Sequence, residues 1–145
     1  HMQLICAQGG GERLVIDTLC ARPDFELVRQ SLSLAEHLLK PNNKEVQEIF
    51  VNYFHRVDDT ELWHLFREMI EAVSMNIKPV RVLKRLVRES GRKAQKILTS
   101  EECELLGMFS DNVKTLERVL QFLQLLCEGH NSPVQRYIFQ QLDNA

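Results

Sequence analysis

Apolar residues recur at steps of three and four along most of the chain, which is the spacing of helices that bury one face. The first such stripe begins after Gly9-Gly10-Gly11, because glycine is unfavourable inside a helix. The second begins after Arg22-Pro23-Asp24 and stops at Pro41-Asn42-Asn43; its apolar positions are Phe25, Val28, Leu32, Ala35, Leu38 and Leu39. No window alternates with period two over the length of a strand. The pattern therefore predicts seven or eight helices and no sheet.

Capping residues predict where the middle helices begin. Asn42 or Asn43 can accept from the free amides of a first helical turn, and Glu45 adds negative charge there. Asp58-Asp59-Thr60-Glu61 has the same arrangement of a capping residue followed by an acid. Pro79 predicts a bend or an end in the helix that follows.

The last third of the chain contains three further predicted starts. Thr99-Ser100-Glu101-Glu102 predicts a short helix, and Ser110-Asp111 predicts the start of a long one that is apolar on two sides. Gly129 suits the left-handed cap that ends this helix, and Ser132-Pro133 suits the start of the final helix.

A weak internal repeat links the two halves of the chain. A shift of 88 positions, from Val46 to Val134, places several identical residues on one another. The pairs are Leu32 and Leu120, Leu38 and Leu126, Asn43 and Asn131, and Gln47 and Gln135. The shift is about twice the ~40–47-residue period of armadillo and HEAT repeats. These observations predict an armadillo/HEAT-like α-solenoid of stacked helix hairpins.

Composition is that of a helix-rich globular domain, with 44% hydrophobic and 26% charged residues in 145. No apolar run approaches the ~20 residues of a membrane span. His1-Met2 is typical of a tag remnant, so we interpret 1–10 as a remnant and flexible start, and 11–145 as a single helical-repeat domain. The four scattered cysteines favour a reducing compartment.

Positive charge is concentrated at about 78–98, which we interpret as a basic connector. Such a run could meet phosphate groups of nucleic acid or of an anionic membrane. It lacks the aromatic residues that would stack on bases, so no nucleic acid is expected. A solvated helix face or connector is the simpler interpretation. An acidic segment of a neighbouring domain, or an acidic regulatory protein, is the next candidate partner.

Glu128 lies at the predicted end of a helix, where exposed carbonyls make a carboxylate unfavourable unless a cation or donor compensates it. It is either a solvated residue or a ligand. Calcium takes six to eight oxygens, so Glu128 could supply only part of a site. Cys127 beside His130 suggests a nucleophile and base, but no third orienting residue is evident and Cys127 belongs to an apolar stripe. Packing is therefore the favoured role of Cys127.

Three segments resemble the inositol trisphosphate and ryanodine receptors, a family of tetrameric calcium-release channels. The closest likeness includes Leu125-Leu126-Cys127-Glu128-Gly129-His130-Asn131, and earlier segments are Leu14-Val15-Ile16-Asp17 and the run from Leu38 to Gln47. The earlier segments favour the inositol trisphosphate type, whereas Glu128-Gly129-His130-Asn131 is closer to the ryanodine type. The residues after Gln135, and the short basic stretch between the matched regions, depart from the family pattern.

This resemblance implies a cytosolic helical solenoid that includes the start of the receptor-homology associated domain. Such a segment would lie on the cytosolic face of the endoplasmic or sarcoplasmic reticulum membrane and contact neighbouring domains of a homotetramer. It would transmit ligand-driven movement to the pore. The resemblance also implies that Glu128 is one ligand of the calcium activation site, whose other ligands lie outside this chain.

Two other functions remain open from the sequence. The chain could be an independent helical-repeat adaptor that binds a protein or peptide in its groove. It could also be an enzyme that uses Cys127 and His130, although nothing else in the sequence amounts to an active site.

Overall fold

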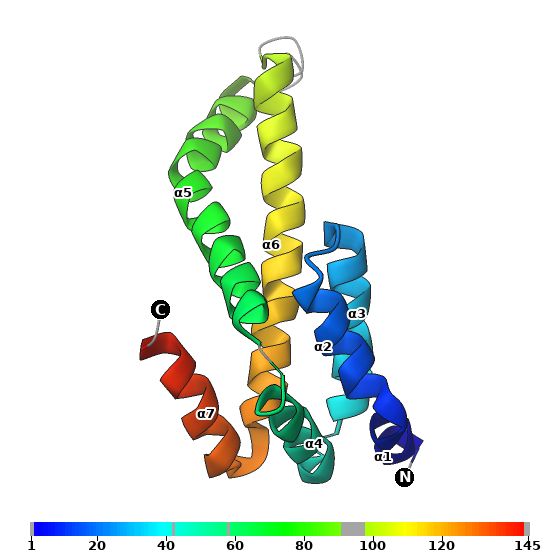
Figure 1. Cartoon of the computed structure of the whole chain (residues 1–145). Coiled ribbons are helices and arrows are strands. Elements are labelled where there is room, and N and C mark those ends of the chain that lie inside the picture. Colours follow the sequence, from blue (N-terminus) through cyan, green and yellow to red (C-terminus); the bar gives the residue numbers. More distant parts are fainter. Residues whose placement is uncertain (1, 42, 58, 91–97, 144–145) are drawn as a thin grey trace.

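The computed structural model describes residues 2–41, 43–57, 59–90 and 98–143, and this part of the chain contains helices and no strand. In chain order the helices are α1 (Met2–Cys6), α2 (Glu12–Cys20), α3 (Phe25–Leu39), α4 (Lys44–Phe54), α5 (Thr60–Ser90), α6 (Ser100–Cys127) and α7 (Ser132–Asp143). A π-helical turn, η1 (Ala7–Gly11), joins α1 to α2, and a 3-10 turn, η3 (Glu128–His130), follows α6. The all-α prediction is confirmed (Figure 1).

Side-chain caps fix the predicted starts of α3, α4 and α6. Asp24 accepts from the amide of Leu27 at 2.9 Å at the start of α3, and Asn43 accepts from the amide of Val46 at 3.3 Å at the start of α4. Thr99 and Glu102 form a reciprocal capping box at the start of α6. These contacts satisfy amides that have no partner within the helix.

Two predictions about helix interruptions need correction or refinement. The predicted start at Ser110-Asp111 is wrong, because α6 runs unbroken from Ser100 to Cys127. Both residues are exposed there, where a short polar side chain costs a helix little. The helix α5 continues through Pro79, and its ribbon bends in its upper half rather than ending (Figure 1).

The first residues are helical from Met2, and Ala7 is fully buried against the core. The glycine run contributes the turn between α1 and α2, where Gly10 has φ of 98°. A left-handed backbone of this kind favours glycine over other residues.

The core lies between α2, α3, α5 and α6 and is extended by α4 and α7. Aromatic rings occupy its lower part: Phe50, Phe54, Trp63, Phe66, Phe122 and Tyr137 form a continuous series of ring contacts. The phenol of Tyr137 on α7 donates to the carboxylate of Asp59, which also accepts from Trp63. This cluster fixes α7 against α4 and α5.

The helix ends follow the 88-residue shift seen in the sequence. The helices α3 and α6 end at Leu39 and Cys127, and α4 and α7 begin directly after Asn43 and Asn131. The helices also pack in pairs across the molecule: α2 contacts α5, α3 contacts α6 and α4 contacts α7. The last two pairs are related by the shift, whereas the positions 88 residues after α2 lie at the start of α6. We refer to α2, α3 and α4 as unit 1, and to α5, α6 and α7 as unit 2.

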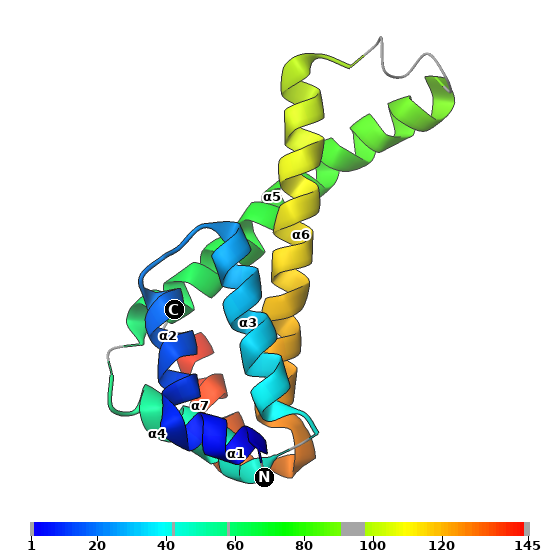
Figure 2. The same ribbon diagram turned by 90° about the vertical axis from the view of Figure 1, so that its right-hand side faces the viewer.

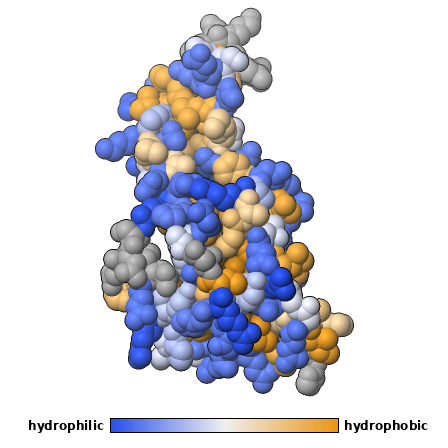
Figure 3. Space-filling view, in the orientation of Figure 1, coloured by the Kyte–Doolittle hydropathy of each residue, from blue (hydrophilic) through white to orange (hydrophobic). Residues whose placement is uncertain are grey.

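The upper parts of α5 and α6 project beyond the rest of the molecule as an arm (Figures 1 and 2). Val80 and Leu83 are buried in the arm, and the Lys84 ammonium lies 5.8 Å from the centre of the Phe109 ring. The basic residues of α5 are exposed along it: Lys78, Arg81, Lys84, Arg85 and Arg88. Apolar surface also gathers over upper α5 (Figure 3). The rest of the predicted basic connector, at 91–97, lies outside the described residues.

Candidate functional site

Glu128 occupies the corner between α6 and α7. The helix ends at Cys127, Glu128 takes an extended backbone with ψ of 153°, and Gly129 has φ of 74°. The prediction of a left-handed backbone at Gly129 is therefore confirmed. The Glu128 side chain is exposed, and no ion pair within the described part of the chain involves it.

The corner is held by the fully buried side chain of Gln47 on α4. Its amide nitrogen donates to the carbonyls of Leu125 at 2.8 Å and of Glu128 at 3.1 Å. Its amide oxygen accepts from the side chain of Asn131 at 3.0 Å. Gln47 thus satisfies carbonyls at the end of α6, which have no partner within that helix. It also fixes the residue that precedes α7.

A second polar contact joins the units along α3 and α6. Arg118 donates to both carboxylate oxygens of Glu36, at 2.8 and 2.9 Å, and Glu36 is almost fully buried. The ammonium of Lys40 lies 3.5 Å from the same carboxylate. This pairing compensates the buried charge, which would otherwise be costly.

The Glu128 carboxylate lies in a region of partial negative charge. The carbonyls at the end of α6 carry partial negative charge, and the Glu128 carboxylate adds to it. Gln47 offsets part of this charge from the buried side only. Within the described residues, no group of three or more His, Cys, Asp or Glu side chains is arranged to hold a metal ion.

The structure does not pair Cys127 with His130. Cys127 is half-buried at the end of α6, and burial raises the pKa of its thiol. A raised pKa lowers the fraction of reactive thiolate, which is opposite to what a nucleophilic cysteine needs. A cavity of about 320 Å³ lies elsewhere, lined by residues that include Arg22, Phe25 and Glu68. Neither Cys127 nor His130 contributes to it.

We expect a thiol-specific reagent to label Cys6 and Cys103 several-fold faster than Cys20 and Cys127 in the folded protein. The first two cysteines are exposed, whereas burial raises the pKa of the other two. Mass spectrometry of labelled peptides over time measures the four rates. Rapid labelling of Cys127 would support the enzyme alternative, and equal rates after denaturation provide the control.

Sequence reasoning found Glu128 and missed the role of Gln47. Gln47 is a polar residue among the apolar positions of its helix, and it recurs in the internal repeat as Gln135. Both features were visible in the sequence. Its partners lie 78 and 81 positions away, however, so only the fold identifies them.

None of the described helices combines the length and apolar character needed to cross a membrane. A search of solved structures gives no match to the chain. The family model described as "RyR and IP3R Homology associated" matches residues 110–145, a segment that includes Glu128, Gly129 and Asn131. Over its last quarter the chain is thus similar to a domain associated with ryanodine and inositol trisphosphate receptors, which supports a relationship to that family of calcium-release channels.

Proposed function

We propose that the chain is a non-catalytic segment of the cytosolic helical solenoid of an intracellular calcium-release channel. The observation that carries this proposal is the family match over residues 110–145, which includes the corner at Glu128. The earlier segments that resemble inositol trisphosphate receptors favour that type of channel. The segment would then lie on the cytosolic side of the endoplasmic or sarcoplasmic reticulum membrane, in a homotetramer.

The paired packing of equivalent helices supports the solenoid. Each helix of unit 1 contacts the helix that has the same place in the order of unit 2, as expected when helical repeats stack in one direction. Three helices in each unit resemble the armadillo arrangement. The longer α5 and α6 of unit 2 add the arm to this plan.

The proposed role is mechanical, and the contacts between units provide its path. Gln47 joins α4 to the Glu128 corner, and Glu36 joins α3 to Arg118 on α6. A displacement of unit 1 would therefore move the corner with it. Allosteric coupling of this kind requires two discrete arrangements of the stacked units.

In the assembled channel, the exposed Glu128 carboxylate would be one ligand of a calcium site between this corner and another domain. Calcium prefers several oxygen ligands, so the site would form only when the partner domain supplies the others. Binding would then hold the two domains together. An isolated chain is expected to bind calcium weakly.

We expect Glu128→Gln in a full-length channel containing this segment to raise the calcium concentration for half-maximal activation by about tenfold or more. The change removes one negative ligand and keeps the shape of the side chain. Single-channel recording over a calcium series measures the effect. Glu104→Gln, at an exposed position of α6, is the matched control. Unchanged activation of the Glu128→Gln channel would exclude the ligand role and leave the solenoid unaffected.

An adaptor that binds a separate protein is the second candidate, and the arm is the observation that favours it. Five basic side chains are exposed on upper α5, together with the apolar side chains of Val82 and Leu86. A basic and apolar helix face suits an acidic amphipathic partner. In a channel, the same face could contact an acidic segment of a neighbouring domain.

A further inference from the structure

The contact made by Gln47 occurs a second time in the chain. Gln3 on α1 donates from its amide nitrogen to the carbonyls of His37, at 2.9 Å, and of Lys40. Gln47 donates in the same way to the carbonyls of Leu125 and Glu128. The acceptors of the two glutamines are separated by the same 88 positions, from His37 to Leu125 and from Lys40 to Glu128. A glutamine of one helix therefore binds the end of the middle helix of the following unit, in two successive places.

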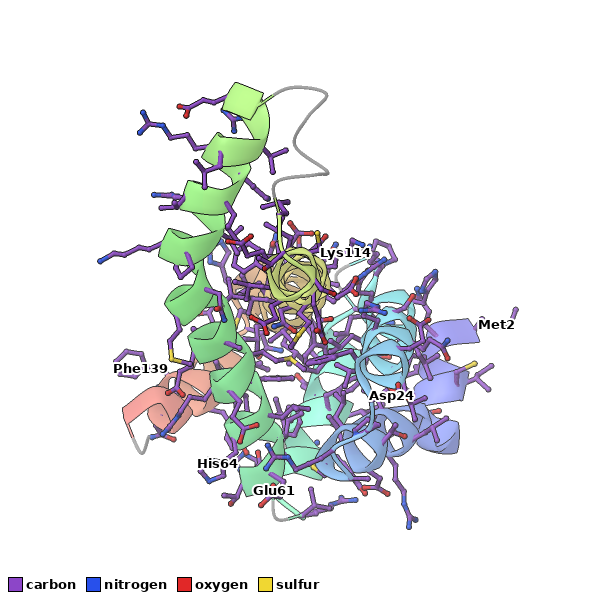
Figure 4. All side chains as sticks on the ribbon, turned by 90° about the horizontal axis from the view of Figure 1, so that it is seen from above. Met2, Asp24, Glu61, His64, Lys114 and Phe139 are labelled. Carbon is purple, nitrogen blue, oxygen red and sulfur yellow. The ribbon has the colours of Figure 1, made fainter. Side chains whose placement is uncertain are left out.

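The residue four positions after each of these glutamines is also equivalent. Ala7 lies four positions after Gln3, and Val51 lies four positions after Gln47. Ala7 and Val51 are both buried. The third member of the series is Gln135, which is exposed and is followed by Phe139, with 64% of its surface exposed. Phe139 points away from the side of the molecule on which Met2 and Asp24 lie (Figure 4).

The middle helices show the same difference between units. On α3, Leu32 is fully buried and lies between Arg29 and Glu36, whose side chains contact Thr115 and Arg118 of unit 2. Its counterpart on α6 is Leu120, which is 52% exposed. The counterpart of the buried Glu36 is Gln124, which is exposed.

We define the open face as Leu120 and Gln124 on α6 and Gln135 and Phe139 on α7. Its residues are equivalent to buried residues of unit 1, which are Leu32, Glu36, Gln47 and Val51. Of these, Glu36 and Gln47 make hydrogen bonds to unit 2. Gln135 currently donates to the carbonyl of Cys127, at 2.9 Å, within its own hairpin. Its counterpart Gln47 instead donates to the neighbouring unit. The open face thus carries the features of the interface between the units, without the neighbour that covers it in unit 1.

We infer that the open face is the docking surface for a further three-helix unit of the kind that this chain contains twice. In the docked state, Gln135 donates to the carbonyls at the end of the middle helix of the incoming unit, and Leu120 and Phe139 are buried. This inference rests on the stacked-repeat part of the proposed function and not on the calcium role of Glu128.

The test is to extend the chain with such a unit, joined at the position that follows from the equivalence of the two units. Because Asp143 is equivalent to His55, a second copy of residues 56–145 is joined directly after Asp143. We expect the extended protein to unfold in a single transition, with a midpoint at least about 3 °C above that of the natural chain. In the extended protein, Gln135→Ala and Phe139→Ala in the first copy should each lower the midpoint by about 3 °C or more. In the natural chain, each should change it by less than about 1 °C.

A second extended protein, with a different point of fusion, guards against failure that is caused only by the way in which the two segments are joined. Phe139 is equivalent to Ala7, so residues 8–57 are joined directly after Phe139, which reproduces the connection from α1 to α2. Single cooperative unfolding of either extension, with the sensitivity to Gln135→Ala, supports the inference. Two independent transitions in both, or failure of both to fold under conditions in which the natural chain folds, would overturn it.

A second copy of the chain is the other possible occupant of the open face. Sedimentation of the natural chain, which measures its oligomeric state, tests for it. A concentration-dependent dimer that Phe139→Ser abolishes would assign the open face to a second copy of the chain, and would also overturn the inference. Calcium activation of the Glu128→Gln channel is independent of these outcomes, so the two proposals can fail separately.

Discussion

Replacement of Gln47 by leucine is expected to lower the free energy of unfolding by about 3 kcal/mol. This is the summed cost of the buried polar groups that would be left without hydrogen-bond partners. The amide is fully buried and makes hydrogen bonds to Leu125, Glu128 and Asn131. Leucine nearly fills the volume but satisfies none of these groups. Urea unfolding followed by circular dichroism measures the change.

The chain contains its own control for this experiment. Gln135→Leu alters the same residue type at the equivalent position of α7, where the side chain is exposed and makes one hydrogen bond, to Cys127. We expect it to cost less than about 1 kcal/mol. If the two variants lost similar stability, Gln47 would not hold the corner, and the mechanical path through α4 would have to be abandoned.

Much of the fold followed from local chemistry in the sequence. Asn43 and the pair Thr99 and Glu102 cap helices where the sequence predicts starts, and Gly129 takes the left-handed backbone. Ser110-Asp111 misled the prediction because a capping residue is only a local preference. The buried residues Thr115 and Val119 continue the packing of α6 past that point, so the helix does not need to restart.

The candidate site was less predictable for a different reason. Glu128 drew attention through its place at a helix end and through a family resemblance, not through a set of nearby ligands. The contacts that position it come from α4, at sequence separations that no local pattern reports. The internal repeat was the signal that could have linked Gln47 to the corner, because Gln47 and Gln135 coincide in it.

The largest loss of stability is expected for Phe122→Ala, at about 4 kcal/mol, from lost burial together with the cavity left behind. Phe122 on α6 is fully buried, and its ring centre lies 5.7 Å from that of Phe50 and 6.3 Å from that of Phe66. Both neighbouring rings meet it edge-on, an arrangement that stabilises aromatic pairs beyond the burial of their apolar surface. The ring therefore joins α4, α5 and α6 at one point.

The matched control is Phe139→Ala, which removes the same side chain from the exposed face of α7 and should cost less than about 1 kcal/mol. Comparison of the two variants by urea unfolding separates packing at the junction of the units from the intrinsic cost of losing a phenylalanine. Because small domains are stable by only about 5–15 kcal/mol, Phe122→Ala should leave the protein close to its unfolding transition under mild denaturant. Equal losses in the two variants would mean that Phe122 does not lie in a shared core, and that the two units do not stack as described.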